Sequence, residues 1–138
     1  MTSGIGSIPC DRHRLLITED NDAVRQALGR VVAYWLNGCV VDLAINGLEA
    51  LQSFRELHQG VVLMDLKMPV MDGETAYTEI GKVCAENNWE MPSVVFCTGY
   101  MPTDDLKNIV AACPAHCILR KPVRPDLLID TVKQHLVV

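Results

Sequence analysis

The sequence predicts an α/β fold in which one five-stranded parallel sheet carries helices on both faces. Five short apolar runs alternate along the chain with five segments of helical periodicity. The run over residues 61–64 is apolar at every position, which is typical of a strand that is covered on both faces. Strict alternation of strand and helix favours parallel pairing with right-handed crossovers. The length of 138 residues fits a single domain.

The predicted strands are the five apolar runs, and two of them lead directly into carboxylates. They cover residues 14–18, 39–44, 61–65, 93–98 and 116–120. Glu19 and Asp20 follow the first strand, and Asp65 closes the third. A charge at the end of a buried strand lies where the strand opens into a loop, and α/β folds place their ligands at such strand ends.

The predicted helices follow the strands in order and are amphipathic. They cover residues 22–36, 47–58, 73–86, 103–112 and 125–136. In the first helix Val24, Leu28, Val31 and Trp35 repeat at helical spacing. We therefore expect this stripe to face the sheet. Gly38 is expected to end the helix, because glycine readily adopts the left-handed conformation of a helix cap.

Five strands in this alternation favour a single doubly wound sheet with the flavodoxin-like (βα)5 topology and strand order 2-1-3-4-5. The switch point of this topology lies between the first and third strands, which are the two that lead into carboxylates. The carboxyl ends of parallel strands open on one edge of the sheet, so polar residues at four strand ends are expected to meet there. These residues are Glu19, Asp20, Asp65, Thr98 and Lys121.

Composition and charge exclude several classes of protein. Hydrophobic residues make up 49% and charged residues 21% of the chain, as in a globular domain. The net charge of -5 and the lack of a basic stripe argue against nucleic-acid binding. No apolar run approaches the roughly 18 residues of a membrane span, and the N-terminus lacks the apolar segment of a signal peptide. We therefore expect no contact with nucleic acid or membrane and a cytoplasmic location.

The N-terminal segment is expected to be a flexible lead of residues 1–13, because it contains Gly4, Gly6 and Pro9. The folded domain is then expected to cover residues 14–138. The chain stops at the fifth predicted helix, so we expect no output domain after it.

Cysteines and histidines offer a second, weaker candidate site. Cys113, His116 and Cys117 lie close together in the sequence, but a zinc site would need a fourth ligand from elsewhere. The chain has no CxxC pair that would strengthen this hypothesis. We expect all four histidines of the chain at the surface or at strand ends, since none is paired with a catalytic partner in the sequence.

The polar residues at the strand ends suit phosphoryl transfer to a carboxylate. Mg²⁺ prefers hard oxygen ligands, and Asp20 and Asp65 can supply them directly while Glu19 orients a metal-bound water. Mn²⁺ could replace it. A backbone carbonyl near Lys67 is expected to complete the protein ligands. Asp65 can then act as the nucleophile and form an aspartyl phosphate.

The remaining two polar residues are expected to contact the phosphoryl group. The ammonium group of Lys121 can pair with one phosphoryl oxygen as a point charge. The hydroxyl group of Thr98 can donate a hydrogen bond to another.

Four motifs in this order resemble the receiver domain of two-component response regulators, over about residues 14–136. They are Thr18-Glu19-Asp20-Asn21, then residues 63–69 with Met71-Asp72-Gly73, then Thr98-Gly99, then Arg120-Lys121-Pro122. Each motif alone is weak, but all four at strand ends are specific. The resemblance implies that Asp65 is the phosphoacceptor, that Glu19 and Asp20 are the acid pair for the metal, and that Thr98 and Lys121 sense and hold the phosphoryl group. It also implies a cis peptide bond before Pro122.

The resemblance further implies partners. A sensor histidine kinase or a histidine phosphotransfer protein would donate the phosphoryl group. Output would come from contact with a downstream protein, through the fourth helix, the fifth strand and the fifth helix. A phosphorylation-dependent homodimer is compatible with the same pattern.

One position departs from the pattern of the family. Many receivers carry tyrosine or phenylalanine three positions before the lysine, where this chain has Ile118. The aromatic half of the usual switch beside Thr98 is therefore missing. We expect Tyr100 to cover the phosphoryl group in part and to slow its hydrolysis by limiting access of water.

Two alternative functions belong to other classes. One is a magnesium-dependent phosphohydrolase with an aspartyl nucleophile, but such enzymes need a second acid two residues after the nucleophile, where this chain has Lys67. The other is a receiver-like scaffold that is never phosphorylated. We therefore expect a signalling phosphoacceptor and not an enzyme that turns over a substrate.

Overall fold

The computed structural model describes residues 7–137 and contains five strands and five helices in strict alternation. They are, in chain order, β1 (Asp11–Thr18), α1 (Asp22–Trp35), β2 (Val40–Ala44), α2 (Gly47–Leu57), β3 (Gln59–Asp65), α3 (Gly73–Asn87), β4 (Ser93–Thr98), α4 (Asp104–Ala112), β5 (Cys117–Arg120) and α5 (Pro125–Lys133). All strand pairs are parallel, and the order in the sheet is β2-β1-β3-β4-β5. The predicted fold class and strand order are confirmed.

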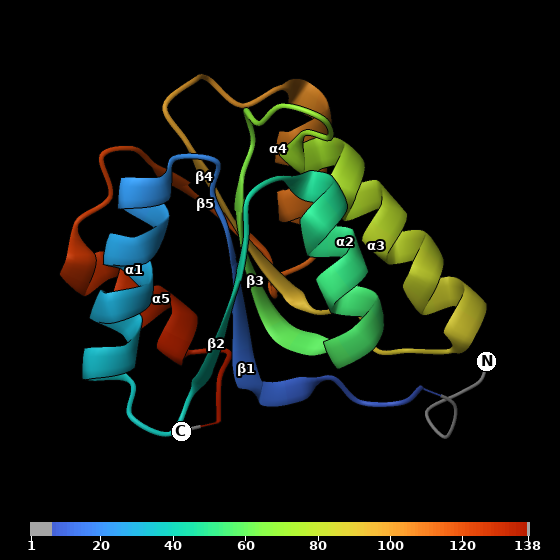
Figure 1. The fold of residues 1–138 in the computed structure, drawn as a ribbon. Helices are drawn as coiled ribbons and strands as arrows, with labels where there is room; N and C mark the ends of the chain where they lie inside the picture. The colour runs from blue at the N-terminus through green and yellow to red at the C-terminus, as the bar shows by residue number, and fades with distance from the viewer. Residues whose placement is uncertain (1–6, 138) are drawn as a thin grey trace.

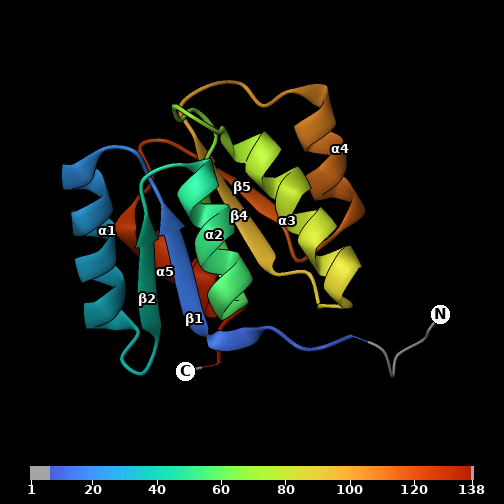
Figure 2. The same cartoon turned by 45° about the vertical axis from the view of Figure 1, so that its right-hand side comes forward.

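The sheet separates two layers of helices (Figures 1 and 2), and an apolar core lies on each of its faces. Helices α1 and α5 cover one face, and α2, α3 and α4 cover the other. Neighbouring residues of a strand point to opposite faces, so Leu15 of β1 enters the α1–α5 core and Leu16 enters the core under α2 and α3. Every residue of β3 is buried, as expected for the central strand. Each fully buried aliphatic side chain contributes about 1.5–3 kcal/mol to the stability of this arrangement.

The register of the strands places their carboxyl ends side by side. Thr18 at the end of β1 pairs with Met64, one residue before the end of β3. Asp65 pairs with Cys97 of β4, and Thr98 pairs with Arg120 at the end of β5. The residues that follow β1 and β5 therefore emerge on either side of Asp65.

Strand β1 begins at Asp11, three residues earlier than predicted, and the preceding chain is held against the domain. Ile8 forms a parallel bridge with Trp89. The Cys10 side chain is buried, and its backbone amide donates to Oε1 of Glu90 at 3.0 Å. Residues 11–13, which were predicted as part of a flexible lead, thus belong to β1, and residues 8 and 10 contact the domain. Residues 1–6 lie outside the described part of the chain.

Helix α1 buries only part of the stripe that its sequence pattern predicts. Trp35 is 65% exposed and Val24 41% exposed, whereas Val32 and Leu36 are fully or almost fully buried. The helix packs on the sheet through a face that includes Leu28, Val32 and Leu36. Apolar residues cover so much of α1 that their periodicity is compatible with more than one inward face, and packing against the sheet selects one of them.

Two histidines are buried, and each directly precedes a strand, so both lie at strand ends, one of the two kinds of position predicted for the histidines. His116 is 5% exposed, and its Nδ1 accepts a hydrogen bond from the backbone amide of Val94 at 3.1 Å. His58 is 9% exposed, caps α2 in the left-handed conformation and stacks on Trp89 with ring centroids 4.3 Å apart. Both side chains form hydrogen bonds with backbone groups far away in the sequence, Val94 for His116 and Glu90 for His58, which sequence periodicity does not reveal.

None of the described helices is long and apolar enough to cross a membrane.

Candidate functional site

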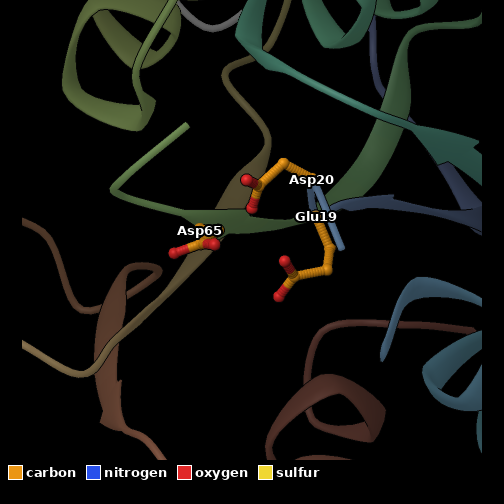
Figure 3. Close-up of side chains that lie close together, drawn as sticks. All are labelled: Glu19, Asp20 and Asp65. Carbon is orange, nitrogen blue, oxygen red and sulfur yellow. The ribbon is translucent and has the colours of Figure 1, made fainter. Parts of the chain in front are cut away.

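Three carboxylates meet at the carboxyl edge of the sheet. Glu19 and Asp20 lie in the loop after β1, and Asp65 ends the neighbouring strand β3. Each offers one oxygen within 4.8 Å of the oxygens of the other two (Figure 3). Glu19 and Asp65 are buried, and Asp20 is exposed. Within residues 7–137 this is the only such cluster of potential metal ligands, and Cys113, His116 and Cys117 do not form one.

Lys121 places an ammonium group between two of these acids. Its Nζ lies 3.0 Å from Oε1 of Glu19 and 3.2 Å from Oδ2 of Asp65. The lysine follows β5 directly, and its backbone amide donates to the carbonyl oxygen of Thr98 at 2.8 Å. The peptide bond between Lys121 and Pro122 is cis. The end of β5 thus delivers a cation to the point where β1 and β3 deliver anions.

The loop between β1 and α1 is held by its own side chains. The second carboxylate oxygen of Glu19 accepts from the backbone amide of Asn21 at 3.0 Å. Asn21 caps α1 by accepting from the amide of Val24 at 3.0 Å. Arg25 is 7% exposed, donates to the Glu19 carbonyl oxygen at 2.9 Å and forms an ion pair with Asp22. This arrangement fixes the orientation of Glu19 toward the site.

Sequence reasoning missed the role of Arg25 in this loop. The sequence around Arg25 carries no signal for this role, because the hydrogen bond depends on the path of the loop.

Burial and neighbouring charged groups have competing effects on the pKa values of Asp65, Glu19 and Lys121. Burial raises the pKa of Asp65 and the negative charge of Glu19 adds to this, although the nearby Lys121 ammonium lowers it in part. Burial would also raise the pKa of Glu19, but hydrogen bonds from the Asn21 amide and from Lys121 outweigh it and lower this pKa. Burial disfavours the ammonium form of Lys121, but its contacts with Glu19 and Asp65 outweigh this and raise its pKa. One cation therefore balances only part of the negative charge.

The loop after Asp65 turns back sharply into α3. Its residue Val70 has a φ of 71°, and Asp72 caps α3 by accepting from the amide of Thr75 at 2.8 Å. The amide of Gly73 donates to the carbonyl oxygen of Leu66 at 3.0 Å. A Cβ atom at Gly73 would collide with the backbone carbonyl oxygen of Asp65. Glycine is thus required where α3 begins against the end of β3.

Lys67 contributes to the site through its backbone, while its side chain points elsewhere. Its amide donates a hydrogen bond to the Asp65 carboxylate. Its Nζ lies 5.4 Å from the centroid of the Tyr100 ring, a cation–π distance. Tyr100 is 61% exposed. The role of the Lys67 carbonyl as a metal ligand and the role of Tyr100 as a cover remain predictions.

Thr98 lies at the end of β4, next to β3, and its hydroxyl group is turned to its own loop. Its Oγ1 accepts from the amide of Tyr100 at 3.0 Å. The threonine is 1% exposed. Ile118 is partly buried against the core that contains Phe96 and Leu106. The structure therefore brings Glu19, Asp20, Asp65 and Lys121 into one cluster and places Thr98 beside it.

The donor set fits a hard divalent cation. Three carboxylates supply oxygen ligands only, as Mg²⁺ requires, and an exposed Asp20 leaves room for the waters that this ion retains. The negative charge that Lys121 leaves unbalanced would be offset by such an ion.

Comparison with known proteins identifies the family. A family model described as the response regulator receiver domain matches residues 15–133. The regulatory protein AtoC of Escherichia coli (strain K12) is 44% identical over 68 residues, which are 49% of this chain and 14% of that protein. A protein-glutamate methylesterase/protein-glutamine glutaminase of Methanosarcina acetivorans is 38% identical over 99 residues, which are 72% of this chain and 26% of that protein. The chain thus spans about a quarter or less of the length of these relatives.

Solved structures agree with this result. The chemotaxis protein CheY4 of Vibrio cholerae shares the fold, with a TM-score of 0.70, 24% identity and coverage of 89% of this chain and 98% of that chain. A two component transcriptional regulator AraC from Clostridium phytofermentans has a TM-score of 0.68 and 30% identity, with coverage of 88% of this chain and 91% of that chain. The chain belongs to the response regulator receiver domain family.

Proposed function

We propose that this receiver domain accepts a phosphoryl group on Asp65 in a magnesium-dependent reaction and signals by contact with other proteins. The observation that carries the proposal is the single cluster formed by the Glu19, Asp20 and Asp65 carboxylates with the Lys121 ammonium group. Asp65 is the acid of this cluster that ends the central strand and accepts a hydrogen bond from the next loop. We therefore assign Asp65 as the nucleophile.

Each side chain has a distinct role in the proposed reaction. An Asp65 carboxylate oxygen forms the new bond to phosphorus while the bond between phosphorus and the donor breaks. Glu19, Asp20 and Asp65 would hold Mg²⁺, which supplies positive charge to the transferred oxygens. Lys121 moves its interaction from the carboxylate to a phosphoryl oxygen, and Thr98 donates its hydroxyl hydrogen to another. This requires the Thr98 hydroxyl to give up the hydrogen bond that it donates to the Tyr100 carbonyl oxygen at 3.3 Å.

The position of Lys67 supports a phosphoacceptor over a phosphohydrolase. Lys67 stands two residues after Asp65, where the hydrolase would need an acid, and its Nζ lies over the Tyr100 ring. In this proposal the phosphoryl group remains on Asp65 until slow hydrolysis, so the protein does not turn over a substrate.

We base the proposed phosphoryl donor on the family, and the proposed cellular compartment on the free thiols. We propose a histidine kinase or a histidine phosphotransfer protein as donor, because a phosphohistidine is a reactive source of the phosphoryl group for a carboxylate. All six cysteines are free, which supports a reducing compartment such as the cytoplasm.

Intact mass after incubation with acetyl phosphate and Mg²⁺ tests the proposal. The wild type is expected to gain one phosphoryl group, about 80 Da, because the proposal has Asp65 as the one acceptor. The gain should vanish in Asp65→Asn and without Mg²⁺. It should persist in Asp105→Asn, which removes an exposed acid of α4. Equal gain in Asp65→Asn and the wild type would contradict the proposal.

A further inference from the structure

A groove lies between the last turn of α1 and the start of α5, apart from the acid cluster. It encloses about 460 Å³ and is lined by Trp35, Pro125, Asp126, Ile129 and Asp130, which we call the α1–α5 groove. The two helices lie side by side on the same face of the sheet (Figure 1). The cavity next to Asp65 shares none of these lining residues.

Trp35 is the main apolar residue that lines the groove, and its side chain is unusually exposed. It is 65% exposed, and the adjacent Tyr34 is 77% exposed. Their rings meet edge to face, with centroids 5.2 Å apart. Neither ring is needed in the core, because Val32 and Leu36 fill the inward face of α1. A large exposed aromatic pair beside a groove is typical of an anchor for a binding partner.

Several exposed apolar side chains lie on α1 and α5. Among residues 7–137, the large hydrophobic side chains that are exposed include none from α4 or β5. Helices α1 and α5 contribute Val24, Tyr34, Trp35 and Leu127. Of these, Tyr34 and Trp35 lie at the groove end of α1, so they provide apolar surface that a partner protein could bury there.

The charges in the groove define the kind of partner. Asp126 forms an ion pair with Arg124, with Nε and Oδ1 3.1 Å apart. Asp130 is exposed and takes part in no ion pair within the described part of the chain. A free carboxylate next to an exposed indole ring favours a cation, since the ring face and the carboxylate both attract positive charge. The net charge of -5 favours the approach of a basic partner.

We propose that the α1–α5 groove is a docking site for a segment of another protein that presents an arginine or lysine next to an apolar side chain. The basic group lies between the Trp35 ring and Asp130, and the apolar side chain packs on Pro125 and Ile129. Because the groove lies apart from the acid cluster, docking does not require phosphorylation of Asp65.

Titration of the full chain with two short peptides, followed by heteronuclear NMR, tests this proposal. The first is the acetylated amide of Arg-Leu-Ala-Arg-Leu, and the second has glutamate in place of both arginines. The arginine peptide should shift the indole signal of Trp35 and the amide of Ile129 and leave the indole of Trp89 in place. Asp130→Asn should weaken binding about threefold, as loss of one exposed charge pair would. Trp35→Ala should abolish the shift at Ile129.

The same titration contains the outcomes that overturn the proposal. Asp105→Asn, which removes an exposed acid on α4, should bind like the wild type. Equal shifts with both peptides, or no shift at millimolar peptide, would exclude recognition of a basic segment. Dependence of the Trp35 signal on the concentration of the protein alone would assign the groove to a second copy of this chain and refute the proposal.

Discussion

Single residues set the chemistry of the acid cluster, and most of them could be predicted from the sequence. Glu19, Asp20, Asp65 and Lys121 each follow a strand run, so the topology of a parallel sheet was sufficient to bring them together. The inward hydrogen bond of Arg25 could not be predicted, because it depends on the exact path of a loop. The same holds for the positive φ of Val70, which has no signature in hydrophobic periodicity.

The backbone of Val70 predicts a stabilising substitution. A β-branched residue with a φ of 71° is strained, and its side chain is 76% exposed, so the side chain offers little compensation. Val70→Asn should raise the free energy of unfolding by about 1 kcal/mol, because asparagine tolerates the left-handed region. Urea denaturation measures this. Val40→Asn, at an exposed position outside the left-handed region, should give no gain, and a gain of equal size there would argue against backbone strain as the cause.

The geometry of Lys121 predicts that phosphorylation and metal binding respond differently to its loss. Its ammonium pairs with Glu19 and Asp65 and would pair with the phosphoryl group, whereas the metal needs only the carboxylates. Lys121→Ala should slow phosphorylation by acetyl phosphate about 100-fold, the effect of losing one charged donor. Mg²⁺ affinity, measured by calorimetry, should not fall. A parallel loss of both would contradict the separate roles. Lys133→Ala on α5 serves as the control.

At the scale of elements, the existence and order of all strands and helices followed from the alternation of apolar runs, but boundaries and faces did not. β1 extends back to Asp11 through polar residues, because Arg12 and Arg14 find partners in Gly60 and Asp42. The prediction for the inward face of α1 was wrong in part, since the apolar residues of this helix are compatible with two stripes. Hydrogen bonds and packing between distant parts of the chain determine where β1 begins and which face of α1 is buried. Neither can be read from a single sequence.

The buried His116, which directly precedes β5 and contacts β4, predicts a loss of stability in mild acid. Burial, together with the charge of His135, lowers the pKa of His116 below its usual value, and its Nδ1 accepts from the Val94 amide. The unfolded chain therefore binds a proton more readily than the folded one. The stabilising contribution is present above the unfolded pKa of about 6.5 and is lost as pH falls from there through the folded pKa.

Substitution of His116 measures this contribution. His116→Asn keeps an acceptor near Nδ1 but does not titrate, so its unfolding free energy should depend less on pH between about 7 and 5 than that of the wild type. His13→Asn, at an exposed position of β1, should behave like the wild type. Identical pH profiles for His116→Asn and the wild type would show that His116 does not titrate in this range.

At the scale of the whole molecule, the sheet brings the ends of β1, β3 and β5 to one edge, and the acids gathered there make stability depend on a cation. Three carboxylates with one lysine leave negative charge unbalanced in the folded state. Mg²⁺ at ten times its dissociation constant should stabilise the fold by about 1.4 kcal/mol through linkage. The melting temperature should rise accordingly in the wild type and less in Asp20→Asn. An unchanged melting temperature in the wild type would argue against a metal site.

Identification of the phosphorylated residue tests the central claim most directly. Sodium borohydride reduces an aspartyl phosphate to homoserine, so treatment after incubation with acetyl phosphate and Mg²⁺ marks the acceptor in the chain. Tandem mass spectrometry of the digested protein should find homoserine at position 65 and at no other aspartate. Homoserine at another aspartate, or none at position 65 in a sample whose intact mass shows phosphorylation, would contradict the assignment of Asp65 as the phosphoacceptor.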